Sequence, residues 1–292
     1  MRSASIVGSA AAAAAMILLG SSVASASALV DYPVAGGQAL RYGLAGALLL
    51  ALVRARLPRL TRRQVLRMLA VAAVGLAGFN AFLIAAVRET DAASVGAVVG
   101  CVPVALALLG PLLESRPLRP RVIAAAALVA VGAGVVQWSG ARPSLLALAL
   151  ALGALACEAA FSLVAVPLIA SVGPAIVATY ACLFATPLLL GASVVVDGRG
   201  ALPIPTGEEA AALVYLAVMV TAIGFALWYA SIEGLGVDRA GLFAGVMPVS
   251  ALLTAAAIGA SELTSVRLLG TIAVGAGVSA GVTAAGRGAV TG

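Results

Sequence analysis

The 292-residue sequence contains no histidine and no lysine, and only 10% of its residues are charged. Without histidine, Ser–His catalytic pairs and histidine-bearing zinc sites are excluded. A soluble domain would carry about 25% charged residues, because a water-exposed surface needs that many polar groups. The scarcity of charge therefore excludes a soluble globular protein.

Acidic residues are also scarce where an intramembrane enzyme would need them. All four aspartates lie in short segments between apolar runs, which argues against a membrane-embedded aspartyl dyad. The three cysteines, Cys101, Cys157 and Cys182, lie within apolar runs, so no disulfide framework is expected. We therefore expect no enzyme, no cofactor and no metal centre.

Hydrophobic residues make up 63% of the chain, and its mean hydropathy is +1.17. A helix that crosses the hydrocarbon needs about 20 apolar residues. Ten stretches qualify, at approximately 4–28, 34–53, 65–86, 92–113, 119–139, 144–166, 173–196, 208–231, 238–260 and 266–286. Continuous runs of this length select helices over a β-barrel, so the sequence predicts an all-α polytopic membrane protein with ten transmembrane helices.

The first stretch, residues 4–28, imitates a secretory signal peptide, with one arginine, an apolar run and then small residues. Cleavage would leave nine spans. We keep the stretch as the first helix, because the repeat described below requires ten.

All 17 basic residues are arginines, and they lie mostly in short loops beside apolar stretches. With the N-terminus inside, the inner segments hold 12 arginines and the outer segments hold 4, while Arg41 lies within a span. Cytoplasmic loops are enriched in arginine, so both termini are expected in the cytoplasm. The placement of the arginines therefore indicates membrane topology and does not indicate a nucleic-acid partner.

The two halves of the sequence share a pattern. Gly-x-x-Pro-Val occurs at Pro103 in the fourth stretch and at Pro248 in the ninth, 145 residues later. The hexapeptide "AVGAGV" occurs in the fifth stretch and again in the tenth. Because five spans is an odd number, two such halves must have opposite orientations in the bilayer. The pattern predicts inverted-topology repeats at 1–140 and 141–292, with a binding site near the midplane between them.

These features resemble the EamA-type families of the drug/metabolite transporter superfamily over nearly the whole chain. The likeness is carried by Pro103 with Glu114, by "LRYGLAGALLL" in the second stretch, by Pro248 with Glu262, and by both copies of "AVGAGV". Within that superfamily the chain looks most similar to the YddG-type amino-acid exporters. The resemblance implies an exporter of the inner membrane.

Glycines and prolines in the repeated stretches have two interpretations. Pro103 and Pro248, with Gly100 and Gly245 one turn earlier, either shape a kink used in gating or make a simple packing kink. The glycines of the hexapeptides are expected to allow close helix packing instead of binding substrate; they are Gly132, Gly134, Gly275 and Gly277.

Glu158 is the only carboxylate well inside a stretch, and Ser162 shares its helical face. A charge there costs roughly 2.5–3.5 kcal/mol on insertion scales, so it faces either a cavity or a neutralising partner. Arg41 is the matching cation, for which snorkelling or a structural ion pair is the expected role. The remaining cavity candidates are Phe79 and Asn80 in the third stretch and Thr221, Phe225 and Trp228 in the eighth; for the aromatic ones, an interfacial belt is the alternative.

The sequence therefore favours a secondary transporter over a channel or a purely structural protein. We expect it to export small metabolites, amino acids above all, by alternating access. Exporters of hydrophobic cations or drugs, or of a lipid-linked precursor, are the alternative. The expected partners are the substrate and the bilayer, with a monomeric chain and with proton or ion coupling left open.

Overall fold

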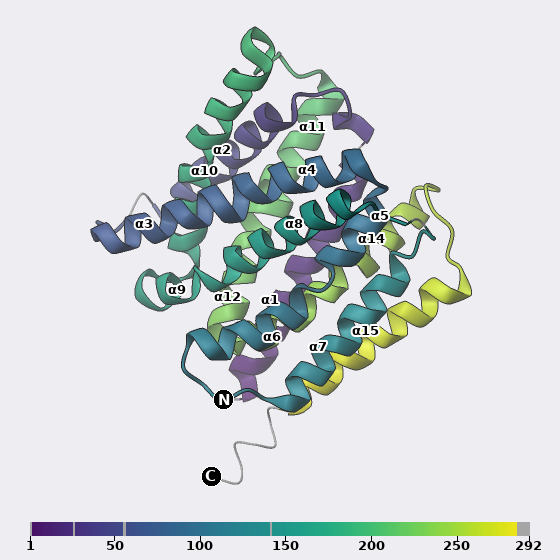
Figure 1. Cartoon of the computed structure of the whole chain (residues 1–292). Coiled ribbons are helices and arrows are strands. Elements are labelled where there is room, and N and C mark those ends of the chain that lie inside the picture. Colours follow the sequence, from purple (N-terminus) through teal and green to yellow (C-terminus); the bar gives the residue numbers. More distant parts are fainter. Residues whose placement is uncertain (1, 26, 55–56, 141, 285–292) are drawn as a thin grey trace.

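The computed structural model describes residues 2–25, 27–54, 57–140 and 142–284, which form a bundle of helices without a strand (Figure 1). The all-α prediction is thus confirmed for this part of the chain. Two of the counted arginines, Arg56 and Arg287, lie outside the described residues.

Eight segments are long and apolar enough to cross a membrane: Ser5–Ser25, Arg62–Glu89, Ala92–Leu113, Leu145–Val172, Pro174–Gly200, Gly207–Leu235, Val237–Ala257 and Ser265–Thr283. Two helices at other expected positions do not meet that criterion. One is α2 (Val34–Leu52), which carries the polar Gln38 and Arg41, and the other is α7 (Pro120–Val136), with 17 residues. Eight spans are therefore supported, and ten remain a prediction.

The other elements of the first half are α1 (Arg2–Ser21), η1 (Ser22–Ser25), η2 (Ser27–Leu29), α3 (Arg62–Ala70), η3 (Val71–Gly78), α4 (Phe79–Glu89), α5 (Ala92–Val99) and α6 (Val102–Leu113). The second half contains α8 (Leu145–Leu163), α9 (Val166–Val172), α10 (Pro174–Asp197), η4 (Gly198–Gly200), α11 (Gly207–Tyr215), η5 (Leu216–Ile223), α12 (Gly224–Leu235), α13 (Val237–Ala240), η6 (Gly241–Gly245), α14 (Val246–Ala257) and α15 (Ser265–Ala284).

Local structure recurs at the interval of the two prolines. Thr61 and Thr206, 145 positions apart (206 minus 61), each begin a helix with a capping box, closed by Gln64 and Glu209 respectively. Each of these helices then runs into an eight-residue π-helical stretch, η3 or η5, whose first residues are again 145 apart (216 minus 71). A duplicated unit would give both halves the same capping box and the same π-helical stretch at equivalent positions.

The prolines lie just after a break in their spans. The fourth span is interrupted between α5 and α6, and Pro103 occupies the first turn of α6. The ninth passes from the 3-10 stretch η6 into α14, and Pro248 lies in its first turn. A proline is tolerated there because first-turn N–H groups have no partner within the helix. The predicted kinks are thus new helix starts.

The halves interlock in a reciprocal way (Figure 1). α7 packs along α15, and α2 packs along α10, so equivalent helices of the two halves meet each other. α1 packs on α12, and α4 packs on α8. In the two repeats α1 is equivalent to α8, and α4 is equivalent to α12. The α1–α12 contact and the α8–α4 contact are therefore the same contact made in the two directions, as expected for two facing repeats.

A close crossing joins α7 to α15. A Cβ on Gly132 would lie 2.8 Å from the Gly270 carbonyl oxygen and 2.9 Å from the Val274 nitrogen. A Cβ on Gly270 would lie 2.8 Å from the Gly132 oxygen and 2.9 Å from the Val136 nitrogen. Each glycine therefore lets the opposite backbone approach, as small residues do between membrane helices.

The hexapeptide glycines divide between two environments. Gly132 and Gly277 lie in the α7–α15 crossing, where a Cβ on Gly277 would meet Val129 at 2.7 Å. Gly134 and Gly275 have no atom within 4 Å of a Cβ position. The contacts of Gly132 are thus mirrored by Gly270 and not by Gly275, its counterpart in the hexapeptide.

α1 is integrated into the bundle. It packs against both α12 and α14, and Ser250 of α14 donates a hydrogen bond to the Ile17 carbonyl at 2.8 Å. Gly20 lies against the backbone of α14 at Met247. Loss of this helix would uncover the faces of α12 and α14 that it buries.

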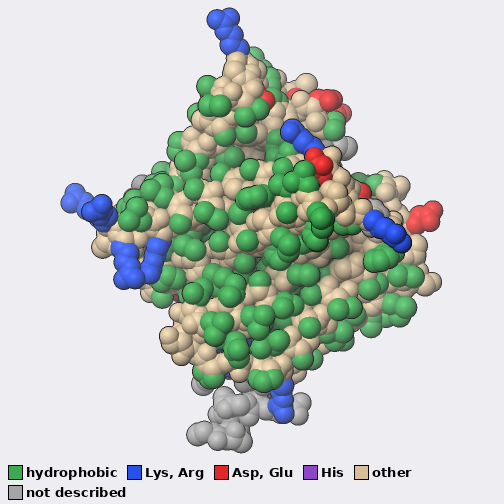
Figure 2. Space-filling model, in the orientation of Figure 1, with side chains coloured by type: hydrophobic (Ala, Val, Ile, Leu, Met, Phe, Trp, Pro, Cys, Tyr) green, Lys and Arg blue, Asp and Glu red, His purple; other side chains and the backbone are tan. Residues whose placement is uncertain are grey.

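The surface fits a hydrocarbon environment. Figure 2 shows a face covered mainly by hydrophobic side chains, with the charged ones at its margins. Large apolar side chains such as Leu145, Leu152 and Val195 are exposed. In water such a surface would be a large apolar patch, whereas lipid covers it without penalty.

Candidate functional site

Polar side chains from both halves meet in the middle of the bundle. The Tyr42 hydroxyl on α2 lies within electrostatic reach of Arg41 on the same helix, Asn80 on α4, Glu158 on α8 and Cys182 on α10. Since α2 and α4 belong to the first half and α8 and α10 to the second, this cluster lies where the halves meet.

Glycines in η3 bring the third span close to α8. A Cβ on Gly75 would lie 2.9 Å from the Phe161 Cα, and one on Gly78 would lie 3.4 Å from the Cys157 Sγ. The π-helical stretch therefore lies against the α8 backbone beside Glu158. Asn80, at the start of α4, and Glu158 both interact with Tyr42.

Glu158 is half-buried, and it has no hydrogen-bond or ion-pair partner among the described residues. A carboxylate at membrane depth is costly, so it is neutral or balanced by a cation. The position leaves its oxygens free to accept from a bound ammonium group or to carry a proton.

Four aromatic rings form a continuous cluster near Glu158. Phe161 lies 5.0 Å from Phe225 and 5.1 Å from Tyr229, measured between ring centroids, and Tyr42 lies 6.2 Å from Phe225. The Tyr229 hydroxyl is buried and has no hydrogen-bond partner within the described part of the chain. These rings join α2, α8 and α12 and present an apolar wall beside the carboxylate.

Three predicted cavity residues are buried and hydrogen-bonded. Trp228 donates from its Nε1 to the Ser162 hydroxyl at 3.1 Å, and both residues are buried. Thr221 is fully buried and accepts a hydrogen bond from Arg41 Nε at 2.5 Å. These contacts tie α12 to α8 and η5 to α2, so the three residues frame the site.

The other cavity candidates keep exposed surface. Asn80 is half-buried and donates from Nδ2 to the Leu76 carbonyl at 2.8 Å. Phe225 is half-buried within the aromatic cluster, and Phe79 is half-buried against the hydrophobic core. Asn80 and Phe225 thus join Glu158 at the meeting of the halves.

Sequence reasoning missed part of the site. Tyr42 is one of only five tyrosines and lies in an apolar run, which is the signal that could have selected it. Arg41 was expected to snorkel or to form a structural ion pair. In the structure no carboxylate of the described residues lies within 4.0 Å of it; it donates to Thr221 and to Gln38 instead.

An ionic contact joins the halves at the end of α6. Arg116, after α6, pairs with Glu114 and lies 3.2 Å from the buried Asp238 of α13. Burial lowers the pKa of Arg116, but its hydrogen bonds to the two carboxylates and their charges outweigh that effect and leave it raised. The guanidinium is thus held charged between the two halves. No group of three or more possible metal ligands occurs within the described residues.

Comparisons with known proteins agree with this architecture. The model of the EamA-like transporter family matches residues 6–138 and again residues 145–281. A Bacillus subtilis (strain 168) protein named uncharacterized transporter YetK is 25% identical over 276 residues, covering 91% of this chain and 84% of that protein. A crystal structure with 24% identity covers 96% of this chain and 97% of its own, with a TM-score of 0.78, and shows a shared fold. The chain is a multi-pass membrane protein, and it belongs to the EamA-like transporter family.

Proposed function

We propose that this protein is a secondary transporter that exports small metabolites, chiefly amino acids with aromatic or apolar side chains, across the inner membrane. The observation that carries the proposal is Glu158, which is half-buried and lies beside the aromatic cluster where the halves meet, with no hydrogen-bond or ion-pair partner among the described residues. A carboxylate suits an ammonium group, and the rings suit an apolar or aromatic side chain.

The two facing repeats support a mechanism of alternating access. The units 1–140 and 141–292 would rock around the central cluster, with both termini in the cytoplasm. The helix breaks before Pro103 and Pro248 lie in equivalent spans, one in each half. They supply paired points at which the spans can bend without opening intact helical turns.

A hydrophobic cation or drug is the second candidate. The same carboxylate and aromatic wall would bind a cation without a carboxylate of its own. A lipid-linked precursor is a third and would need a lateral opening toward the bilayer. The three differ in charge and in size, so a substrate panel separates them.

The test is counterflow in proteoliposomes, with a panel of labelled amino acids, hydrophobic cations and sugars. The proposal expects exchange with aromatic or apolar amino acids. Exchange with cations but with no amino acid would refute it in favour of a drug exporter.

Glu158→Gln then tests the carboxylate. We expect loss of exchange, or loss of its pH dependence where Glu158 carries the coupling proton. Glu233→Gln, which changes an exposed glutamate in the last turn of α12, is the matched control and should leave exchange unaltered.

A further inference from the structure

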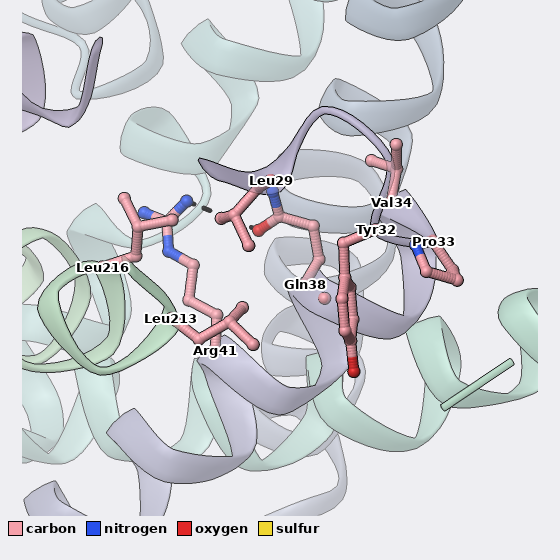
Figure 3. Close-up of a pocket in the computed structure, with 9 residues that line it drawn as sticks. Leu29, Tyr32, Pro33, Val34, Gln38, Arg41, Leu213 and Leu216 are labelled. Carbon is pink, nitrogen blue, oxygen red and sulfur yellow. Dashed lines mark hydrogen bonds between the residues drawn. The ribbon is translucent and has the colours of Figure 1, made fainter. Parts of the chain in front are cut away.

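A cavity of about 80 Å³ lies at the start of α2 (Figure 3). Tyr32 and Gln38 line it together with Arg41, and Leu213 and Leu216 supply an apolar wall. A single water needs roughly 10–15 Å³ of such space, so the cavity has room for a group larger than one water molecule.

Arg41 enters this cavity as a cation with unused donors. Its Nε donates to the Thr221 hydroxyl at 2.5 Å, and its Nη1 donates one long hydrogen bond, 3.4 Å, to the side-chain Oε1 of Gln38. A guanidinium has five N–H donors in a fixed fork. No carboxylate in the described part of the chain lies within 4.0 Å to neutralise it.

We expect α2 to cross the membrane, where an unneutralised guanidinium is costly and stays only when a counter-charge or water compensates it. The hydrogen bond to Thr221 holds the Nε side of the guanidinium in place. The Nη1 and Nη2 groups are then available to donate to a group in the cavity. Planar, bidentate recognition of an oxyanion is the interaction for which arginine is best suited.

We propose that Arg41 forms a binding subsite for an oxyanion, namely the carboxylate of the transported solute. The assignment rests on the proposed transport function and deepens it. The Tyr42 hydroxyl, next to Arg41 in the chain, interacts with both Arg41 and Glu158. The proposal assigns the carboxylate of a zwitterion to Arg41 and its ammonium group to Glu158. A transporter built this way binds amino acids more tightly than the corresponding amines.

Three related ligands test the subsite: L-phenylalanine, phenethylamine, which lacks the carboxylate, and 3-phenylpropionate, which lacks the amine. Binding to the detergent-solubilised full chain is measured by ligand-induced thermal stabilisation. A charge-assisted hydrogen bond contributes about 1.5–3 kcal/mol, so Arg41→Gln should raise the Kd for 3-phenylpropionate by roughly 10- to 100-fold. The Kd for phenethylamine should stay the same.

Two further variants keep the test decisive. Arg41→Lys retains the charge but loses the fork, so it should weaken binding of 3-phenylpropionate less than Arg41→Gln does. If Arg41→Gln does not fold, a selective loss of the carboxylate ligand in Arg41→Lys still supports the subsite. Arg88→Gln, an exposed arginine in the last turn of α4, is the control and should change neither Kd.

A lipid phosphate has the same oxyanion chemistry, so binding is repeated with and without phosphatidylglycerol in the micelles. Competition by phosphatidylglycerol that depends on Arg41 would overturn the solute assignment in favour of a lipid headgroup. Equal binding of 3-phenylpropionate by wild type and both Arg41 variants, or no binding by wild type, would overturn the subsite. Arg41-dependent binding without amino-acid exchange in liposomes would retain the subsite and refute the proposed function.

Discussion

Gly132→Ala probes the α7–α15 crossing with one methyl group. The new Cβ would lie 2.8 Å from the Gly270 oxygen and 2.9 Å from the Val274 nitrogen. Both atoms belong to the backbone, so no side chain can rotate away. Since ordinary contacts begin at 3.4 Å, the helices would have to separate by about 0.6 Å (3.4 minus 2.8).

Two opposing effects set the magnitude. Overpacking of a tight contact costs about 1–3 kcal/mol, and a gap of this size forfeits about a quarter of the dispersion energy at neighbouring contacts. Alanine is also a better helix former than glycine by about 1 kcal/mol. Gly134→Ala isolates the second effect, because nothing lies within 4 Å of its Cβ position. The two variants should therefore differ by about 1–3 kcal/mol.

The assay is thermal unfolding of the full chain in one detergent. Gly132→Ala should unfold at a clearly lower temperature than Gly134→Ala. Gly270→Ala should match Gly132→Ala, because its backbone contacts have the same distances. Equal melting temperatures for Gly132→Ala and Gly134→Ala would refute the close crossing.

Three other changes have defined outcomes. Arg116→Gln leaves the buried carboxylate of Asp238 without its charged partner and should cost about 1–3 kcal/mol; adding Asp238→Asn should recover most of the loss in thermal unfolding, and additive losses would contradict the pairing. Asp91 caps α5, and hydrogen bonds from the side chain and then the backbone of Ser94 lower its pKa. The ionised Asp91 cap should therefore stabilise the fold above the unfolded-state pKa near 3.9, and this stabilisation should be lost as pH falls through the lower folded-state pKa. Asp91→Ala should lower the free energy of unfolding by about 1 kcal/mol at pH 7. That difference from wild type should shrink in thermal unfolding below about pH 4. Pro248→Ala should lower the maximal rate of transport in liposomes more than it raises KM, and equal effects on both would indicate a folding role.

The prolines and the apolar runs were sufficient to predict the helical class. Pro103 and Pro248 mark the same place in both halves because a helix break must recur wherever the unit recurs. The capping boxes begun by Thr61 and Thr206 could also have been read from the sequence, since Thr-x-x-Gln and Thr-x-x-Glu are local signals.

Other features depended on distant contacts. The two copies of "AVGAGV" are identical, yet their glycines face differently, because helix rotation is set by the neighbouring helix and not by the peptide itself. Arg41 was expected to snorkel or to form a structural ion pair. Its contact with Thr221 could not be predicted, since it joins positions 180 residues apart. The burial of Trp228 likewise required Ser162 on another helix.

The central claim is that a site between the halves is reached from both sides of the membrane. Asn80→Cys, combined with Cys101→Ala because Cys101 is the exposed native cysteine, adds a thiol at the candidate site, where the native Cys157 and Cys182 are buried. A membrane-impermeant thiol reagent is then applied to the outer or inner face of oriented vesicles, with Cys101→Ala alone as the background. We predict labelling from both faces and slower labelling when a transported amino acid is present. Labelling from one face only under every condition, or labelling that no substrate slows, would contradict the account.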